Sequence, residues 1–112
     1  MVDRPWSQEQ IDEARTVPFS IVLDHLGAFH KLDHLYAPLD PRRRSKRVQV
    51  GYQGRDFIFI FTGPKFVNQL LPEGAVDRGG GGSIDFVRHL TGCNFVNAVK
   101  VCLDAINERR VK

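Results

Sequence analysis

Residues 48–61 read VQVGYQGRDFIFIF, and this stretch decides the fold. Apolar residues alternate with polar or small ones over residues 48–52, which is the period of two expected for a strand with one buried face. Residues 53–56 are predicted to form a hairpin turn, because Gly54 supplies the positive φ that tight turns need. Residues 57–61 then form an apolar strand, with phenylalanines on one face and isoleucines on the other.

The predicted sheet extends in both directions from this hairpin. A second turn over residues 62–65 leads into a third strand over residues 66–71. Residues 28–41 are interpreted as a loop or a short strand, since Pro38 and Pro41 interrupt any longer element. The middle of the chain is therefore expected to be a small antiparallel sheet of three or four strands.

Helices are expected on the N-terminal side of the sheet. Ser7 and Gln10 have the spacing of a capping box at the start of a helix over residues 8–15. Pro18 suits the first turn of a second helix, whose apolar residues recur at helical spacing. Gly27 is the expected end of that helix.

Two more helices are expected on the C-terminal side. Residues 72–82 are interpreted as a loop that ends in four glycines, after which Ser83 caps a helix that Gly92 closes. Asn94 caps a last helix, whose apolar face continues to Ile106. The predicted fold class is therefore α+β, an antiparallel sheet flanked by N- and C-terminal helices.

Length and composition favour one domain over residues 1–112, with residues 1–9 and 108–112 expected to fray. The chain is 42% hydrophobic and 26% charged, which is enough apolar material for a single core. Its two cysteines exclude a disulfide-rich scaffold. No apolar run approaches the ~20 residues of a membrane span, and the N-terminus does not resemble a signal peptide. A cytoplasmic protein is expected.

Positive charge gathers in residues 42–47, which read RRRSKR. The chain has a net charge of +3, and the five basic residues of this segment account for more than the whole excess. Four of the five are arginines, which can form two hydrogen bonds with one phosphate. The segment is therefore a candidate nucleic-acid site, the alternative being a solvated loop or edge strand.

Phe57, Phe59 and Phe61 form an aromatic stripe with two interpretations. Aromatic rings on a sheet can stack unpaired bases at ~1–3 kcal/mol per base, and Tyr52 lies nearby. A domain of this size also needs such side chains for its core, which is the interpretation we favour. The isoleucine face of the same strand would then point to solvent.

No catalytic or metal-binding arrangement emerges from the sequence. His25, His30, His34 and Cys93 do not form a zinc-finger pattern, because no second cysteine stands at the required spacing from Cys93. The glycines at 79–82 lack a Walker lysine and a dinucleotide fingerprint, so a flexible entry to a helix is expected, with contact to a DNA phosphate still open. We therefore expect that the protein is not an enzyme and that it binds no cofactor or metal.

Residues 80–87, GGGSIDFV, resemble a motif of the N-terminal zinc-binding domain of bacterial DnaG-type primases. In that family a glycine pair precedes Ile-Asp-Phe at a helix start, and a glycine and an aromatic-plus-Ala-Val helix follow. Gly92 and residues 95–99 fit this pattern. The resemblance covers residues 10–106 and is greater to the shortened, cysteine-free forms in primase-related proteins of plasmids and conjugative elements.

The zinc ligands of the family are missing from this sequence. Its Cys-Pro-x-His knuckle falls on residues 37–40, APLD, and its second cysteine pair falls on Gly74 and Asp77. The resemblance therefore implies a zinc-ribbon-like fold without zinc. The apolar side chains of residues 57–71 would replace the stabilisation that the metal supplies.

The related primase domain holds the single-stranded template and does not synthesise the primer. The resemblance thus implies a non-catalytic protein that binds single-stranded DNA in replication or transfer of a mobile element. A primase, helicase or polymerase encoded nearby would be its protein partner. The expected DNA contacts are Arg42, Arg43, Arg44, Lys46, Arg47, Tyr52, Arg55, Lys65 and Arg78.

The alternative function is a protein-interaction module. A domain that has lost its zinc can also lose DNA binding and keep its fold for docking or for forming a homodimer. The face that carries Ile58 and Ile60, or an open edge of the sheet, would then be the interface.

Overall fold

The structure is a computed structural model, and it describes residues 5–38, 40, 42–75 and 78–111. It confirms an α+β fold with helices at both ends of the chain. The sheet, however, has five strands rather than three or four. In chain order the elements are α1 (Gln8–Arg15), α2 (Phe19–His25), β1 (Phe29–Leu32), β2 (Lys46–Tyr52), β3 (Arg55–Thr62), β4 (Lys65–Asn68), β5 (Gly79–Gly81), α3 (Ser83–Thr91) and α4 (Phe95–Val111).

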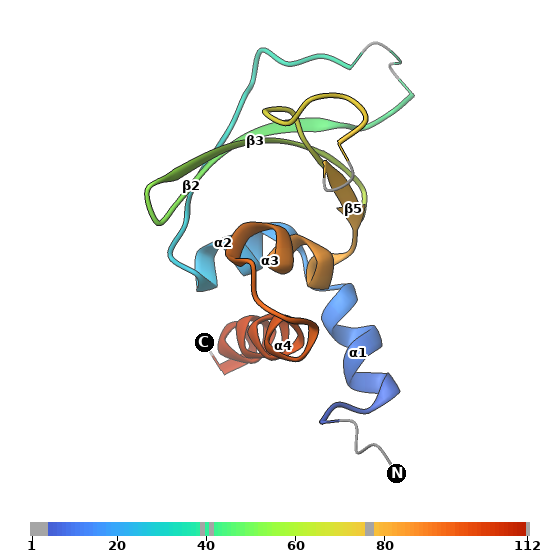
Figure 1. The fold of residues 1–112 in the computed structure, drawn as a ribbon, viewed down its shortest axis with the longest axis vertical. Coiled ribbons are helices and arrows are strands. Elements are labelled where there is room, and N and C mark those ends of the chain that lie inside the picture. Colours follow the sequence, from blue (N-terminus) through green and yellow to red (C-terminus); the bar gives the residue numbers. More distant parts are fainter. Residues whose placement is uncertain (1–4, 39, 41, 76–77, 112) are drawn as a thin grey trace.

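The strands form one sheet in sequence order, and each is antiparallel to the next. Figure 1 shows the sheet curving over the helices, with all four helices on one side. The segments that follow β1, in cyan, and β4, in yellow, extend from the other side (Figure 1). We call the side without helices the outer face of the sheet.

The central hairpin forms as the alternating pattern predicts. Gln53 and Gly54 both have positive φ, 49° and 76°, which is the conformation of a tight two-residue hairpin turn. Phe57 and Phe59 are 3% and 0% exposed and lie against the helices. Phe61 is partly buried against the same core, and its ring contacts that of Phe19 in a tilted arrangement, with centroids 4.7 Å apart. The core interpretation of the phenylalanine stripe is thus confirmed, and these rings do not serve as a base-stacking surface.

Two strands lie where the sequence predicted no definite strand. β1 comes from the segment interpreted as a loop or a short strand, and β5 consists of glycines that were expected to be a loop. A Cβ at Gly79 would lie 2.4 Å from the carbonyl oxygen of Phe66. Glycine is required there because β5 approaches β4 so closely, a tertiary constraint that strand propensity does not reveal.

The N-terminal helix begins as predicted. Ser7 Oγ accepts from the backbone N–H of Gln10 at 3.1 Å, and Gln10 Oε1 accepts from the backbone N–H of Ser7 at 2.9 Å. The predicted capping box is therefore present. It fixes the start of α1 at the residue where the spacing placed it.

At the start of α3 the prediction was wrong by one residue. Gly82 is the N-cap, and Ser83 is the first helical residue. Ser83 is fully buried, and its hydroxyl donates to the backbone carbonyl of Val17 instead of capping the helix. Gly92 closes α3 in the left-handed conformation, as expected.

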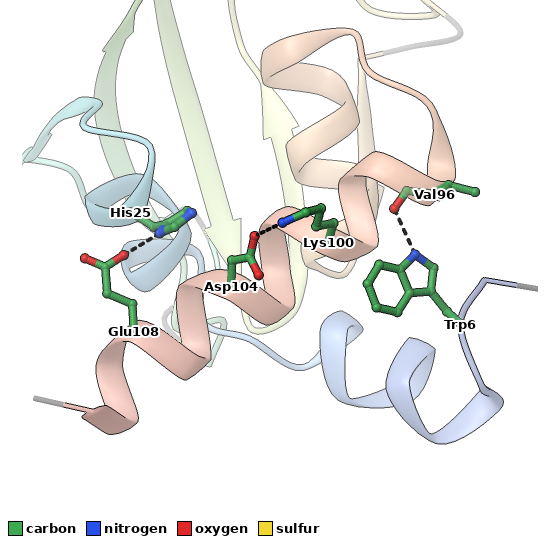
Figure 2. Close-up of polar contacts among 6 residues, drawn as sticks. All are labelled: Trp6, His25, Val96, Lys100, Asp104 and Glu108. Carbon is green, nitrogen blue, oxygen red and sulfur yellow. Dashed lines mark hydrogen bonds and ion pairs between the residues drawn. The ribbon is translucent and has the colours of Figure 1, made fainter.

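The last helix is longer than its apolar pattern suggested. Asn94 caps it by accepting from the backbone N–H of Asn97 at 2.9 Å, but the helix continues to Val111. Its last turns are held by contacts between elements: His25 Nδ1 lies 2.5 Å from Glu108 (Figure 2). Its first turn is held by Trp6, whose Nε1 donates to the carbonyl of Val96 at 2.9 Å (Figure 2). Fraying of both ends stays a prediction: α1 includes residues 8–9, α4 includes residues 108–111, and residues 1–4 and 112 lie outside the described part.

Candidate nucleic-acid interface

The register of the sheet divides the predicted DNA contacts between two faces. Directly paired residues of antiparallel strands lie on the same face. Arg47 pairs with Ile60 and therefore lies on the outer face, whereas Lys46 pairs with Phe61 on the helix side. Lys65 pairs with Thr62 and lies on the outer face with Arg47. The predicted set is therefore not one continuous site.

Arg47 is engaged within the protein. Its Nε donates to Asp33 Oδ2 at 2.8 Å, and its Nη2 donates to the same oxygen. The guanidinium also lies over the ring of Tyr36, 5.1 Å from the ring centroid. The hydrogen bond from Arg47 is the main reason that the pKa of Asp33 is lower than its ordinary value, and the hydrogen bond from the backbone N–H of Leu35 is the next. Arg47 thus anchors the segment after β1, and its assignment as a phosphate contact stays a prediction.

The three arginines before β2 differ from one another. Arg42 is 91% exposed, and its Nε lies 3.3 Å from Asp40 Oδ1 in a local, solvated pair. Arg43 and Arg44 are exposed and form no ion pair with any residue that the structure describes. They are the members of the basic segment best able to meet a phosphate.

The loop that carries these arginines is tied to the sheet where it ends. Ser45 Oγ lies 2.7 Å from Thr62 Oγ1, so a hydroxyl pair joins the last loop residue to β3. Arg43 and Arg44 come directly before this pair and are therefore held close to the sheet. Lys65 pairs with Thr62, which brings a third exposed cation to the same end of the outer face.

The outer face carries two residues that the sequence interpretation missed. Phe29, in β1, is 58% exposed and pairs with Gly51. Lys31 is exposed and pairs with Gln49, so it lies on the same face two residues along the strand. The Phe-x-Lys spacing was a detectable signal, but only if residues 29–32 had been assigned as a strand.

A hollow of about 660 Å³ opens on this face beside β1. Ile58 at its floor is half-buried, whereas Leu35 at its rim is 94% exposed. Such a mixed apolar and basic hollow can receive a flat ring between its walls. Its lining residues are Lys31, Leu32, Asp33, His34, Leu35, Arg47, Gln49 and Ile58.

Tyr52 and Arg55 do not lie on the outer face, and Arg78 is hydrogen-bonded to the backbone. Tyr52 pairs with Arg55 on the helix side and packs against the core. The guanidinium of Arg55 lies over Phe57, 5.0 Å from the ring centroid. Arg78 Nε donates to the carbonyl of Leu71 at 3.1 Å. The register thus places Tyr52 and Arg55 on the other face from Arg47, and the assignment of these three residues as DNA contacts stays a prediction.

The described residues do not fit the zinc site of the family that the sequence resembles. Ala37 and Gly74 provide no side-chain ligand, and Asp40 is paired with Arg42. In residues 5–38, 40, 42–75 and 78–111, no three His, Cys, Asp or Glu side chains are grouped as a metal ion requires. Leu39 and Asp77 also align with the zinc knuckles of that family, but they lie outside the described residues.

Comparison of the chain with models of known protein families, with curated proteins and with solved structures finds no match. Among the helices of the described residues, none is long and apolar enough to cross a membrane.

Proposed function

We propose that this chain binds single-stranded DNA on the outer face of its sheet, without catalysing a reaction on it. The observation that carries the proposal is the set of exposed side chains on that side. It combines cations without an ion-pair partner in the described chain with one exposed aromatic ring. The set comprises Arg43, Arg44, Lys31, Lys65 and Phe29.

The chemistry of this face suits an unpaired strand better than a duplex. The cations attract backbone phosphates whatever the base sequence. The ring of Phe29 and the hollow lined by Lys31 and Ile58 offer stacking contacts, which need bases that are free of a complementary strand. The resemblance to primase domains supports the same choice, and it suggests a role in replication or transfer of a mobile element.

Salt-dependent binding to a fluorescent single-stranded oligonucleotide tests the proposal. Arg43→Ala and Arg44→Ala should each lower the slope of log affinity against log salt by about 0.7, because each removes one phosphate contact. That corresponds to binding about fivefold weaker at about 0.1 M salt. Arg109→Ala, which removes one exposed cation from the helix side, is the matched control.

Two further measurements sharpen the test. Phe29→Ala should weaken binding to the single strand but leave the salt slope unchanged, because stacking displaces no counterions. A duplex of the same sequence should bind more weakly than the single strand. Binding that is independent of salt, or equal losses for Arg43→Ala and Arg109→Ala, would contradict the proposal.

A second function, self-association through the edge of the sheet, is favoured by the exposed apolar side chains at β1. Phe29, Leu32 and Leu35 are 58%, 39% and 94% exposed. β1 is also an edge strand, which offers unpaired backbone groups to another strand. Light scattering over a range of protein concentrations separates the two functions: a dimer that Leu35→Ser abolishes supports this one, and a monomer that binds DNA supports the first.

A further inference from the structure

A second hollow, of about 520 Å³, opens on the helix side of the sheet. It lies between α3 and strands β3 to β5, so it is separate from the outer face. Its volume falls in the range of roughly 300–1,000 Å³ that is usual for small-molecule sites. The lining residues that carry chemistry are Arg55, Asn68, Asp85, Arg88, His89 and Cys93.

Two arginines line this hollow from opposite layers of the fold. Arg55 begins β3 and is positioned by its stacking on Phe57, whereas Arg88 is exposed on α3. Neither forms an ion pair with any carboxylate of the described chain, although Asp85 lies one helical turn before Arg88. Two guanidinium groups at one hollow are suited to a phosphate, which each can bind through two hydrogen bonds.

The floor of the hollow is built from a fixed polar pair. Asn68 is 5% exposed, and its Oδ1 accepts from the backbone N–H of Leu70 at 3.0 Å. That bond turns Asn68 Nδ2 toward His89 Nε2, 3.1 Å away. Because Nδ2 can only donate, Nε2 is the acceptor of this hydrogen bond. The pair is thus set before any ligand arrives.

Part of the wall of the hollow is formed by the glycine strand β5. Gly79 lines the hollow, and a Cβ on it would lie 2.4 Å from the carbonyl oxygen of Phe66. A Cβ on Gly80 would lie 3.3 Å from Asp85 Cβ. The glycine strand therefore leaves room beside Asp85, whose carboxylate can accept hydrogen bonds from sugar hydroxyls.

We propose that this hollow binds a nucleoside 5′-phosphate. Arg55 and Arg88 hold the phosphate, and Asp85 accepts a hydrogen bond from a hydroxyl of the sugar. The phosphate can belong to a free mononucleotide or to the 5′ end of a nucleic-acid strand, since both present the same phosphomonoester. The site uses none of the outer-face residues, so it does not depend on the function proposed above.

Cys93 provides a local probe for this site. It lines the hollow and is half-buried, whereas Cys102 is fully buried. Alkylation of the folded chain at neutral pH should therefore report on Cys93 alone. We expect 5′-AMP, or a short single strand with a 5′-phosphate, to slow alkylation of Cys93. Adenosine, and the same strand with a 5′-hydroxyl, should not.

Variants connect the protection to the proposed contacts. Arg88→Gln and Arg55→Ala should each weaken protection by about tenfold or more in apparent Kd, as expected when a charge-assisted hydrogen bond is lost. In Arg109→Ala, the phosphate-bearing probes should protect Cys93 from alkylation as well as they do in the unmodified chain. Circular dichroism checks the fold of each variant, and Arg88→Gln keeps the test valid if Arg55→Ala does not fold.

The outcomes are decisive in both directions. Protection by either phosphate-bearing probe that Arg88→Gln weakens supports the site, and which probe protects identifies the source of the phosphate. Protection by neither probe, equal protection by adenosine, or equal protection in Arg88→Gln and the unmodified chain would overturn it. Loss of single-strand binding in Arg43→Ala has no bearing on this result, so the two proposals can fail separately.

Discussion

Asp33 shows how one carboxylate can decide the role of a basic segment. It accepts a hydrogen bond from Arg47, so this arginine is paired within the protein. It also accepts from the backbone N–H of Leu35, which orders the turn after β1. The sequence could not reveal this pairing, because Asp33 and Arg47 are 14 residues apart and meet only when β1 pairs with β2. The alternation of faces, by contrast, was available: a period of two already separates Lys46 from Arg47.

The ion pair of Asp33 predicts how stability changes with pH. Its pKa is lowered from 3.8 in the folded chain, so its contribution is complete above about pH 4 and is lost as the pH falls through the folded value. Asp33→Asn should therefore be less stable than the unmodified chain at pH 6, and the two should converge at acidic pH. Urea unfolding, followed by the fluorescence of Trp6, measures this difference. A constant difference down to pH 2 would contradict the mechanism.

Cys102 predicts an effect at the alkaline end. Burial is the main reason that the pKa of its thiol rises from 9.0 to about 12, and the nearby Cys93 adds to this effect. The neutral thiol is favoured in the folded chain, so this stability is present below about pH 9 and is lost as the pH rises toward 12. The free energy of unfolding should fall between pH 8 and pH 10.5, and it should fall less in Cys102→Ala.

At the scale of elements, local signals predicted the elements that are defined locally. The central hairpin follows from alternation and a glycine turn, and α1 follows from its capping box. β5 has no such signal, because its glycines are selected by the close approach of Phe66 and Asp85. The outer face depends on β1, a strand of four residues whose pattern is too short to identify. For this reason the sequence identified the arginine loop but not Phe29 or Lys31.

The glycine strand can be tested with a matched pair of variants. A Cβ at Gly79 would collide with the backbone of Phe66, whereas a Cβ at Gly81 would meet nothing within 4 Å. Gly79→Ala should therefore destabilise the fold by about 1–3 kcal/mol. Gly81→Ala should change stability by less than about 0.5 kcal/mol. Equal effects of the two substitutions on the urea midpoint would show that β5 is not packed as described.

At the scale of the whole molecule, one cluster of aromatic rings joins the helices to the sheet. Phe59 is fully buried and contacts Phe66 and Phe86, with ring centroids 5.9 and 5.1 Å apart. Such a core can supply the stabilisation that small domains often draw from a metal. It also explains why the phenylalanine stripe is not available to bases.

This core predicts that stability depends on packing and not on a metal. Phe59→Ala should cost about 3–5 kcal/mol, a large part of the total stability of a small domain. Excess EDTA should leave the thermal midpoint of the unmodified chain unchanged. A midpoint that EDTA lowers and zinc restores would show that a metal contributes to the fold.

The one-sided placement of the helices has a practical consequence. α1 and α4, the elements nearest to the two ends of the chain, both belong to the helix layer (Figure 1). Attachment to a sensor chip or a bead through either end would therefore leave the opposite surface turned toward the solution. Immobilisation by each end in turn should give the same apparent affinity for an oligonucleotide, whereas attachment through Lys31→Cys in a Cys93→Ser background should block binding.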